Sequence, residues 1–308
     1  MAKSYTVSSR LLAHYRRTAR DLPWRRTHDP YEVLVSEVML QQTQASRVTP
    51  AFDRFVRRFP TLEALAAASL AAVLREWSGL GYNRRARDLH RIARMSPHGL
   101  PRTVAELDAL PGIGAYTAGA IASFAFGQRV PFADVNIQRV LGRVFLGRPG
   151  TNKDAVRLDA AAMPTRSSDR WHHALMDLGA TICKPREPKC TECPLNADCR
   201  YARGSAGTAA SPLRVAAGGS LRRGARQRVA KGAAAVRYQD PPQRAAAYPA
   251  SDRRVRGAIV RALVDADAGM TVRALEKSIG DPRVGRLVEM LTADGLVESA
   301  GRRVRLPS

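Results

Sequence analysis

The sequence predicts an all-α body over residues 1–203, followed by a small module of helices and a hairpin. Three observations support this prediction. Apolar residues between positions 9 and 203 recur at helical spacing, with almost no alternating strand pattern. Turns that contain proline or glycine interrupt this pattern at short intervals. Beyond residue 204 the composition changes, and the last segment shows helical and then strand patterns. A chain of 308 residues is long enough to bury a full hydrophobic core.

The expected helices of the body are short and are separated by prolines, because proline lacks the N–H that a helix interior needs. In chain order we expect helices over 11–19, 31–48, 51–59, 70–77, 84–93, 115–126 and 135–146. The separating prolines are Pro30, Pro50, Pro60, Pro101, Pro111 and Pro131.

Residues 204–250 are rich in Gly, Ala, Ser, Pro and Arg and hold few large apolar side chains. Such a segment buries too little to offset the entropy of ordering its backbone, so we interpret it as a flexible basic linker. Helical patterns follow over 252–264, 271–279 and 282–293, and two short strands are expected within 296–306. Three helices and a hairpin predict a winged-helix-like module over 251–308.

The charge of the chain favours a polyanionic partner. The net charge is +23, of which +13 falls in residues 1–203 and +10 in residues 204–308. Nucleic acid is the commonest intracellular polyanion, although basic faces are also often merely solvated. Aromatic residues make up only 6% of the chain, which gives little support to a base-stacking, RNA-binding protein. No apolar run is long enough for a membrane span or signal peptide, so we expect no membrane partner.

The four cysteines of the chain stand within seventeen residues, in the pattern C-x6-C-x2-C-x5-C. A zinc site built from knuckles would show two close pairs, whereas this run has a single close pair flanked by lone cysteines. Disulfides belong to oxidising compartments, for which the sequence shows no leader. The run therefore favours a [4Fe-4S] cluster over zinc, with Cys183, Cys190, Cys193 and Cys199 as ligands. Lys184 and Arg186 make the loop basic, which suits contact with phosphates.

A second motif, Leu110-Pro111-Gly112-Ile113-Gly114, lies between two expected helices. Gly112 and Gly114 allow the backbone to turn tightly and approach a ligand closely. The free N–H groups at the start of the following helix form an anion site. An ordinary connection between helices would also use glycine, but this hairpin is suited to hold a phosphate.

Two acidic residues stand out from their surroundings. Glu37 lies in the run Val33-Leu34-Val35-Ser36-Glu37-Val38-Met39-Leu40, which is apolar nearly all round. A carboxyl group buried there is held protonated to higher pH, as a general acid requires, although pairing with an arginine is the plainer alternative. Asp134 precedes the helix expected over 135–146, where it would cap the helix and stay ionised. An ionised carboxylate can stabilise a sugar cation.

Taken together, the hairpin, the aspartate and the cysteine run resemble the helix-hairpin-helix superfamily of DNA glycosylases, and the resemblance covers residues 23–200. It implies a catalytic region over 1–203 with two all-α lobes. These are a six-helix lobe at about 30–130 and a cluster lobe formed by 1–29 and 131–203. DNA and an extruded base would lie between them.

The string Ser36-Glu37-Val38-Met39-Leu40-Gln41-Gln42-Thr43-Gln44 resembles MutY-type adenine DNA glycosylases, as do Leu22-Pro23-Trp24-Arg25 and Trp77-Ser78-Gly79-Leu80-Gly81-Tyr82. The resemblance implies that Glu37 protonates adenine, that Asp134 stabilises the sugar cation and that Asn136 supports Asp134. It also implies that Gln42 and Tyr82 enter the duplex at the lesion.

The chain departs from relatives in three places. Tyr116 stands where the bifunctional endonuclease III carries its lysine nucleophile, so we expect hydrolysis with little or no strand cleavage. Val135 and Asn83 replace a glycine and a tyrosine of familiar adenine glycosylases. The Nudix-like domain that reads 8-oxoguanine in many members is not evident in the sequence.

The predicted function is base-excision repair of double-stranded DNA that carries adenine opposite 8-oxoguanine or guanine. The alternatives are a thymine or uracil mismatch glycosylase, which Tyr116-Thr117-Ala118 also resembles, and a non-catalytic iron-sulfur DNA-binding regulator. We expect a monomeric, cytoplasmic bacterial protein associated with the nucleoid. His172 and His173 are interpreted as surface or packing residues.

Overall fold

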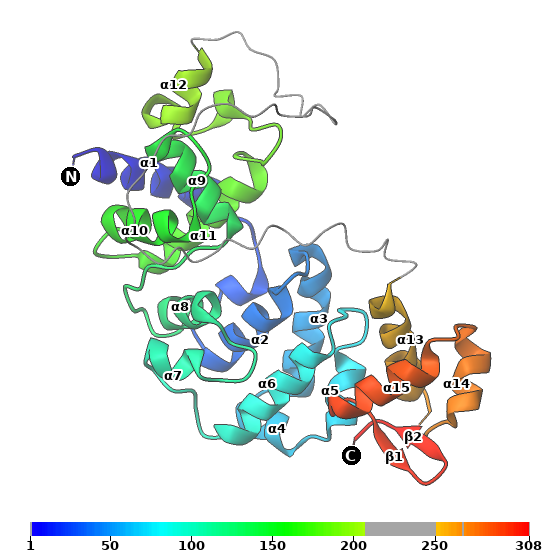
Figure 1. Cartoon of the computed structure of the whole chain (residues 1–308). Helices are drawn as coiled ribbons and strands as arrows, with labels where there is room; N and C mark the ends of the chain where they lie inside the picture. Colours follow the sequence, from blue (N-terminus) through cyan, green and yellow to red (C-terminus); the bar gives the residue numbers. More distant parts are fainter. Residues whose placement is uncertain (1, 207–250, 267, 308) are drawn as a thin grey trace, which may run out of the picture.

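The computed structural model describes residues 2–206, 251–266 and 268–307, so most of the expected linker lies outside the described residues. The described residues form the all-α body and the small C-terminal module that the sequence predicts (Figure 1). No helix of this part of the chain is long and apolar enough to cross a membrane.

The body has two lobes, which we call the central lobe and the cysteine lobe. The central lobe holds α2 (Pro30–Leu40), α3 (Ala45–Arg58), α4 (Leu62–Ala67), α5 (Leu70–Glu76), α6 (Arg84–Met95), α7 (Val104–Asp108) and α8 (Ala115–Phe124). A short 3-10 turn, η1 (Pro23–Arg25), precedes it. The cysteine lobe holds α1 (Ala2–Thr18), α9 (Val135–Leu146), α10 (Asn152–Ala162), α11 (Ser168–Thr181), η2 (Cys190–Glu192), η3 (Asn196–Asp198) and α12 (Arg200–Ala206).

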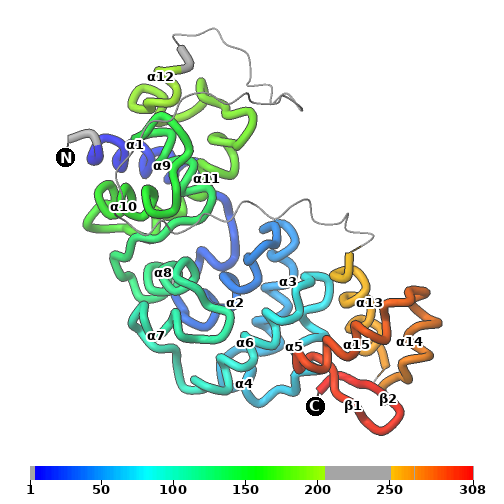
Figure 2. The backbone as a smooth tube through the Cα atoms, in the orientation of Figure 1, coloured from blue at the N-terminus to red at the C-terminus, as the bar shows by residue number. Residues whose placement is uncertain are grey.

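The cysteine lobe is built from both ends of the body. The backbone leaves this lobe after α1, forms the central lobe and returns with α9 (Figure 2). Helix α1 packs against α10 and α11, and α9 packs against α10, α11 and α12. The active-site candidates of α2, α8 and the start of α9 therefore lie where the chain passes between the lobes.

Local sequence explains where many of the helices begin. The helices α4, α5, α7 and α10 start at Thr61, Ser69, Thr103 and Thr151, whose side-chain oxygens accept hydrogen bonds from backbone N–H groups of the first turn. Asp29 caps α2 in the same way, and Pro30 follows at the first helical position, where its missing N–H costs nothing.

The single helix expected over 31–48 is wrong, and so is the break expected at Pro50. The segment forms two helices, because α2 ends at Leu40 and α3 begins at Ala45, with Pro50 inside α3. Arg85 of α6 explains the early end of α2. Its buried guanidinium donates hydrogen bonds to the carbonyl oxygens of Val38, Met39 and Gln41 at 2.9, 2.8 and 2.6 Å. These carbonyls are the ones that a helix leaves without partners at its C-terminal end.

The C-terminal module contains α13 (Asp252–Val264), α14 (Val272–Ile279), α15 (Val284–Ala293), β1 (Glu298–Ala300) and β2 (Arg303–Arg305). The two strands pair antiparallel, and Met270 adds one further bridge to Val304. This order agrees with the expected helices and hairpin. The module lies beside the central lobe, where α13 packs on α5 and the Ala71 N–H donates to the Pro307 carbonyl at 2.9 Å (Figure 1).

Candidate active site

Helix α2 places Glu37 inside the central lobe, where only 6% of the residue is exposed. Burial, and to a smaller extent the negative charge of Asp134, raise the pKa of Glu37 to about 7. The charge of Arg25 and a hydrogen bond with Tyr116 act in the opposite direction but are smaller. A substantial share of the Glu37 carboxyl groups is therefore protonated near neutral pH, as a proton donor requires.

Asp134 is half-exposed and caps α9. Its Oδ1 accepts hydrogen bonds from the backbone N–H groups of Asn136 and Ile137, at 2.9 and 2.7 Å. Its Oδ2 accepts a third from the side-chain amide of Asn136 at 2.8 Å. Three N–H donors and the N-terminal end of a helix stabilise the negative charge of this carboxylate.

Tyr116 forms a hydrogen bond with Glu37 and lies within reach of the charge of Asp134. Its pKa is raised well above the ordinary value by burial and by the charges of Glu37 and Asp134, so the phenol stays protonated at neutral pH. The ring packs edge-on against Phe132, at 5.5 Å between centroids. The structure thus brings together Glu37, Tyr116, Asp134 and Asn136, which the sequence analysis had taken from three separate motifs.

Sequence reasoning did not single out the arginine behind Asn136. The Arg139 guanidinium donates to Asn136 Oδ1 at 2.6 Å and to the backbone carbonyls of Gly179 and Cys183 at 2.8 and 2.7 Å. Asn136 is further confined by Gly179, since a Cβ atom added there would lie 2.6 Å from Asn136 Cβ. The spacing of Asn136 and Arg139, three residues apart on one helix, was the available signal.

Arg25 is a second residue whose setting the sequence did not reveal. It lies close enough to lower the pKa of Glu37, yet its guanidinium donates to both carboxylate oxygens of Asp177, at 2.7 and 2.8 Å. A neighbouring arginine was the plainer alternative for a buried glutamate. Here that arginine is already committed to another carboxylate, and Glu37 keeps its raised pKa.

The glycine hairpin leads into α8. Gly112 has φ of +72°, and Gly114 is the N-cap of α8. A side chain at position 112 would also press on Asp88, 3.2 Å from an added Cβ. Gln41 donates to the Gly112 carbonyl at 3.2 Å, which joins the hairpin to the turn after α2.

Gln42 and Tyr82 share an unusual backbone conformation. Their φ values are +55° and +51°, and only one other non-glycine residue of the described chain, Ser167, has a positive φ. Such conformations cost roughly 1–3 kcal/mol and persist where the surroundings enforce them. Arg85 lies between the two positions, since it binds the Gln41 carbonyl and stands 5.3 Å from the centre of the Tyr82 ring.

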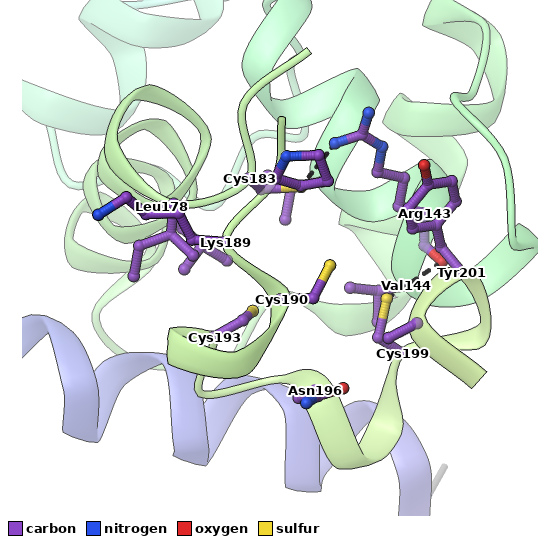
Figure 3. Close-up of a pocket in the computed structure, with 14 residues that line it drawn as sticks. Arg143, Val144, Leu178, Cys183, Lys189, Cys190, Cys193, Asn196, Cys199 and Tyr201 are labelled. Atoms are coloured by element: carbon purple, nitrogen blue, oxygen red, sulfur yellow. Dashed lines mark hydrogen bonds between the residues drawn. The ribbon is translucent and has the colours of Figure 1, made fainter. Parts of the chain in front are cut away.

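The four cysteines come together in the cysteine lobe. All four are free of disulfides and line one cavity together with residues of α9, α11 and α12 (Figure 3). The Arg143 guanidinium donates to Cys183 Sγ at 3.4 Å and to the Lys184 carbonyl at 2.7 Å, and it stacks over the Tyr201 ring. The side chains of Lys184 and Arg186 are exposed on the loop.

The two adjacent histidines are packing residues, of which His172 is buried and His173 is half-buried. His172 is buried and hydrogen-bonded to Asp159 at 2.8 Å, and the His173 ring stacks on Phe124. Asp159 also accepts from the Phe132 N–H at 3.1 Å, so this buried group supports the segment that leads to Asp134.

A hairpin, a capped aspartate and a buried glutamate between two helical lobes define the class of protein. Residues 35–163 match the family model of the HhH-GPD superfamily base excision DNA repair proteins. The solved structure of a thermostable thymine-DNA glycosylase superposes with a TM-score of 0.61 at 30% identity, over 66% of this chain and 98% of that one. Endonuclease III in a non-covalent DNA complex shares the fold, with a TM-score of 0.57 at 23% identity, over 66% and 96% of the two chains.

Relatives found by sequence comparison narrow the class of protein further. The adenine DNA glycosylase of Mycobacterium tuberculosis (strain CDC 1551 / Oshkosh) is 39% identical over 299 residues, which cover 93% of this chain and 88% of that protein. The human adenine DNA glycosylase is 44% identical over 210 residues, or 62% of this chain and 38% of that protein. The chain belongs to the MutY-type adenine DNA glycosylase family of base-excision repair enzymes.

Proposed function

We propose that the protein hydrolyses the N-glycosidic bond of adenine mispaired with 8-oxoguanine or guanine in double-stranded DNA. The observation that carries the proposal is the difference between two acids that influence each other electrostatically. Glu37 has a pKa of about 7, whereas Asp134 is surrounded by three N–H donors. Relatives named adenine DNA glycosylase support the choice of base.

In the proposed reaction, protonated Glu37 donates its proton to a ring nitrogen of the extruded adenine. The bond between the base and the sugar then breaks, and its electrons leave with the base. Asp134 stabilises the positive charge on the sugar until water adds to it. At about 4 Å and an effective dielectric near 20, this attraction is about 4 kcal/mol, or nearly a thousandfold in rate.

Release of the base is proposed to occur without efficient strand cleavage. A lyase needs an amine that attacks the sugar to form a Schiff base. Tyr116 fills the position of the endonuclease III lysine and stays a protonated phenol. Borohydride should therefore trap no covalent complex between the protein and substrate DNA. A trapped complex at a yield close to the amount of base released would contradict this part of the proposal.

DNA contacts are assigned to residues around the active site. Gln42 and Tyr82 would enter the duplex beside the extruded base, and the hairpin at Gly112 and Gly114 would hold a backbone phosphate. Lys184 and Arg186 are exposed and basic, which suits further phosphate contacts.

The cysteine cavity is proposed to hold a [4Fe-4S] cluster. In the described parts of the chain, no three His, Cys, Asp or Glu side chains converge closely enough to bind a single metal ion. Thiolates that bind a cluster each contact a different iron and stand farther apart, so four free cysteines around one cavity fit a cluster better than zinc. When bound, the cluster would fix the loop that carries Lys184 and Arg186.

The deciding experiment is single-turnover base release from matched duplexes that contain A opposite 8-oxoguanine, A opposite G, T opposite G and U opposite G. Release of adenine from the first two is expected. The structural likeness to a thymine-DNA glycosylase makes pyrimidine release the second candidate, and faster release of thymine or uracil would replace the adenine proposal with it. Absence of release from every duplex would favour a non-catalytic DNA-binding protein.

A further inference from the structure

A groove of about 960 Å³ lies between the central lobe and the C-terminal module. Six arginines line it and none of its lining residues is acidic. Three arginines come from the central lobe and three from α13. We call this site the arginine groove, and its arginines are Arg47, Arg84, Arg85, Arg253, Arg256 and Arg261. A concave site with this charge attracts an extended polyanion.

Ion pairs hold the two walls of the arginine groove together. Asp294, at the end of α15, forms salt bridges with Arg84 of the central lobe and with Arg256 of α13. Arg87 donates to the backbone carbonyl of the same aspartate. The single carboxylate of Asp294 cannot neutralise both arginines, so the groove keeps a net positive charge. The contact sets α13 opposite the turns that carry Gln42 and Tyr82.

The arginine groove opens beside the residues proposed to enter the duplex. Gln42 and Tyr82 line it, and both are held at positive φ. Arg253 of α13 donates a hydrogen bond to the Tyr82 hydroxyl, and its guanidinium stands 5.0 Å from the ring centre. Arg85 stands 5.3 Å from the same ring centre. A residue of the C-terminal module therefore fixes the orientation of Tyr82.

Residues 207–250 contain eight Lys or Arg and one acidic residue, so their charge opposes binding to the arginine groove. The hairpin joins the turn after α2 through the hydrogen bond between Gln41 and Gly112. If the hairpin and Glu37 hold the strand of the extruded base, the groove beyond Gln42 and Tyr82 faces the other strand.

We propose that α13 forms the second wall of the DNA site. In this arrangement Arg261 contacts backbone phosphates of the strand opposite the excised base, Arg256 holds α13 in place through Asp294, and Arg253 positions Tyr82. The proposal rests on the proposed function, since it requires a duplex opened at Gln42 and Tyr82. The winged-helix-like module would thus help to hold the DNA strand opposite the excised base.

The first test compares charge reversal at Arg261, in the groove, with reversal at Arg273. Arg273 is exposed on α14 of the same module and lies outside the groove. Arg261→Glu should weaken binding of the mispaired duplex about tenfold or more and reduce the slope of log K against log salt by about 1. Arg273→Glu should change both much less. Equal effects of the two variants would overturn the proposal.

Strand assignment is tested with duplexes whose phosphates beside the mispair are replaced by neutral methylphosphonates, on one strand at a time. Neutralising the opposite strand should weaken binding by the wild type but add little to the loss in Arg261→Ala. An additive loss on that strand, or non-additivity on the adenine strand alone, would overturn the assignment. Base release by the wild type on the unmodified duplex tests the proposed function separately.

The role of Arg253 is tested with 2-aminopurine, a fluorescent adenine analogue that brightens when it leaves the base stack. Arg253→Ala should reduce the increase in fluorescence on binding at saturating protein, while the melting temperature of the protein stays unchanged. Arg253→Lys should restore part of the increase, because lysine keeps the charge over the ring but not the planar fork of donors. An unchanged fluorescence increase in Arg253→Ala would overturn the positioning role.

Discussion

Glu37 and Asp134 carry the same functional group in opposite surroundings. Glu37 stands on a helix buried on nearly every side, and burial raises its pKa to about 7. Asp134 stands half-exposed at the start of a helix, with three N–H groups directed at its oxygens. The comparison shows how two carboxyl groups of one protein can be suited to different tasks, the first to the proposed donation of a proton and the second to the proposed stabilisation of a cation.

The largest change would come from removing the proton donor. Glu37→Gln keeps the shape of the side chain but has no acidic proton, so single-turnover base release should fall by about a thousandfold or more. The duplex should still bind. A variant that keeps more than a tenth of the wild-type rate would remove Glu37 from its proposed role.

Removing the carboxylate of Asp134 should slow base release nearly as much. Asp134→Asn can still cap α9, since asparagine is as good an N-cap as aspartate, so the melting temperature should change little. The rate of base release should fall by about a thousandfold, in line with an attraction of about 4 kcal/mol. The comparison of the two acids fails if Asp134→Asn loses stability and activity in proportion.

The pH dependence separates the two acids in the wild type. Because only protonated Glu37 donates, the rate should decline as pH rises through about 7, approaching tenfold for each further pH unit. The free energy of unfolding should also depend on the protonation of Glu37. Its folded pKa lies above the ordinary 4.5, so its contribution is fully present below pH 4.5 and is lost as pH rises through about 7.

The size of this loss is about 3 kcal/mol for a shift of this magnitude. Denaturant unfolding of Glu37→Gln and of the wild type at several pH values between 4.5 and 8 measures this loss. It is the difference between the two proteins in how much the free energy of unfolding changes with pH. Parallel pH profiles for the two proteins would mean that Glu37 is ionised throughout this range.

A smaller effect is expected from crowding Asn136. Gly179→Ala puts a methyl group 2.6 Å from Asn136 Cβ, so the amide that donates to Asp134 must move. Overpacking of this kind costs about 1–3 kcal/mol of stability, and we expect a roughly tenfold slower release of the base. Gly285→Ala on α15 is the control, because its nearest neighbour is at 3.4 Å and alanine favours a helix. Equal stability and equal rates of base release in the two variants would show that a methyl group at position 179 does not displace Asn136.

The smallest effect concerns Tyr116. Its hydrogen bond lowers the pKa of Glu37, so Tyr116→Phe should move the decline of the rate to higher pH. The rate at low pH should change less than tenfold. A shift of the profile to lower pH would contradict the hydrogen bond as described.

Sequence alone predicted the helical class, the module and the members of the site, because these depend on periodicity and on short motifs. It did not predict the break between α2 and α3, since the cause is Arg85, which lies more than forty residues away from the carbonyls it binds. Tertiary contacts of this kind override local helix preference.

The same limit explains what was missed in the site. Periodicity marked Glu37 as buried, but it could not show that Arg25 is engaged by Asp177, 152 residues away in the chain. Nor could the sequence predict the arginine groove, because the groove forms where the C-terminal module packs against the central lobe. The roles of the site residues remain predictions for the experiments above.

Arg85 has a consequence for which substitutions the protein can tolerate. Its guanidinium reaches the carbonyl oxygens at the end of α2, the Thr43 hydroxyl at 3.1 Å and the Gly81 carbonyl at 3.1 Å. Lysine offers three donors from a single point and cannot reach acceptors on both sides. An exchange that sequence comparison would score as conservative would therefore release two loops at once, the one before α3 and the one before α6.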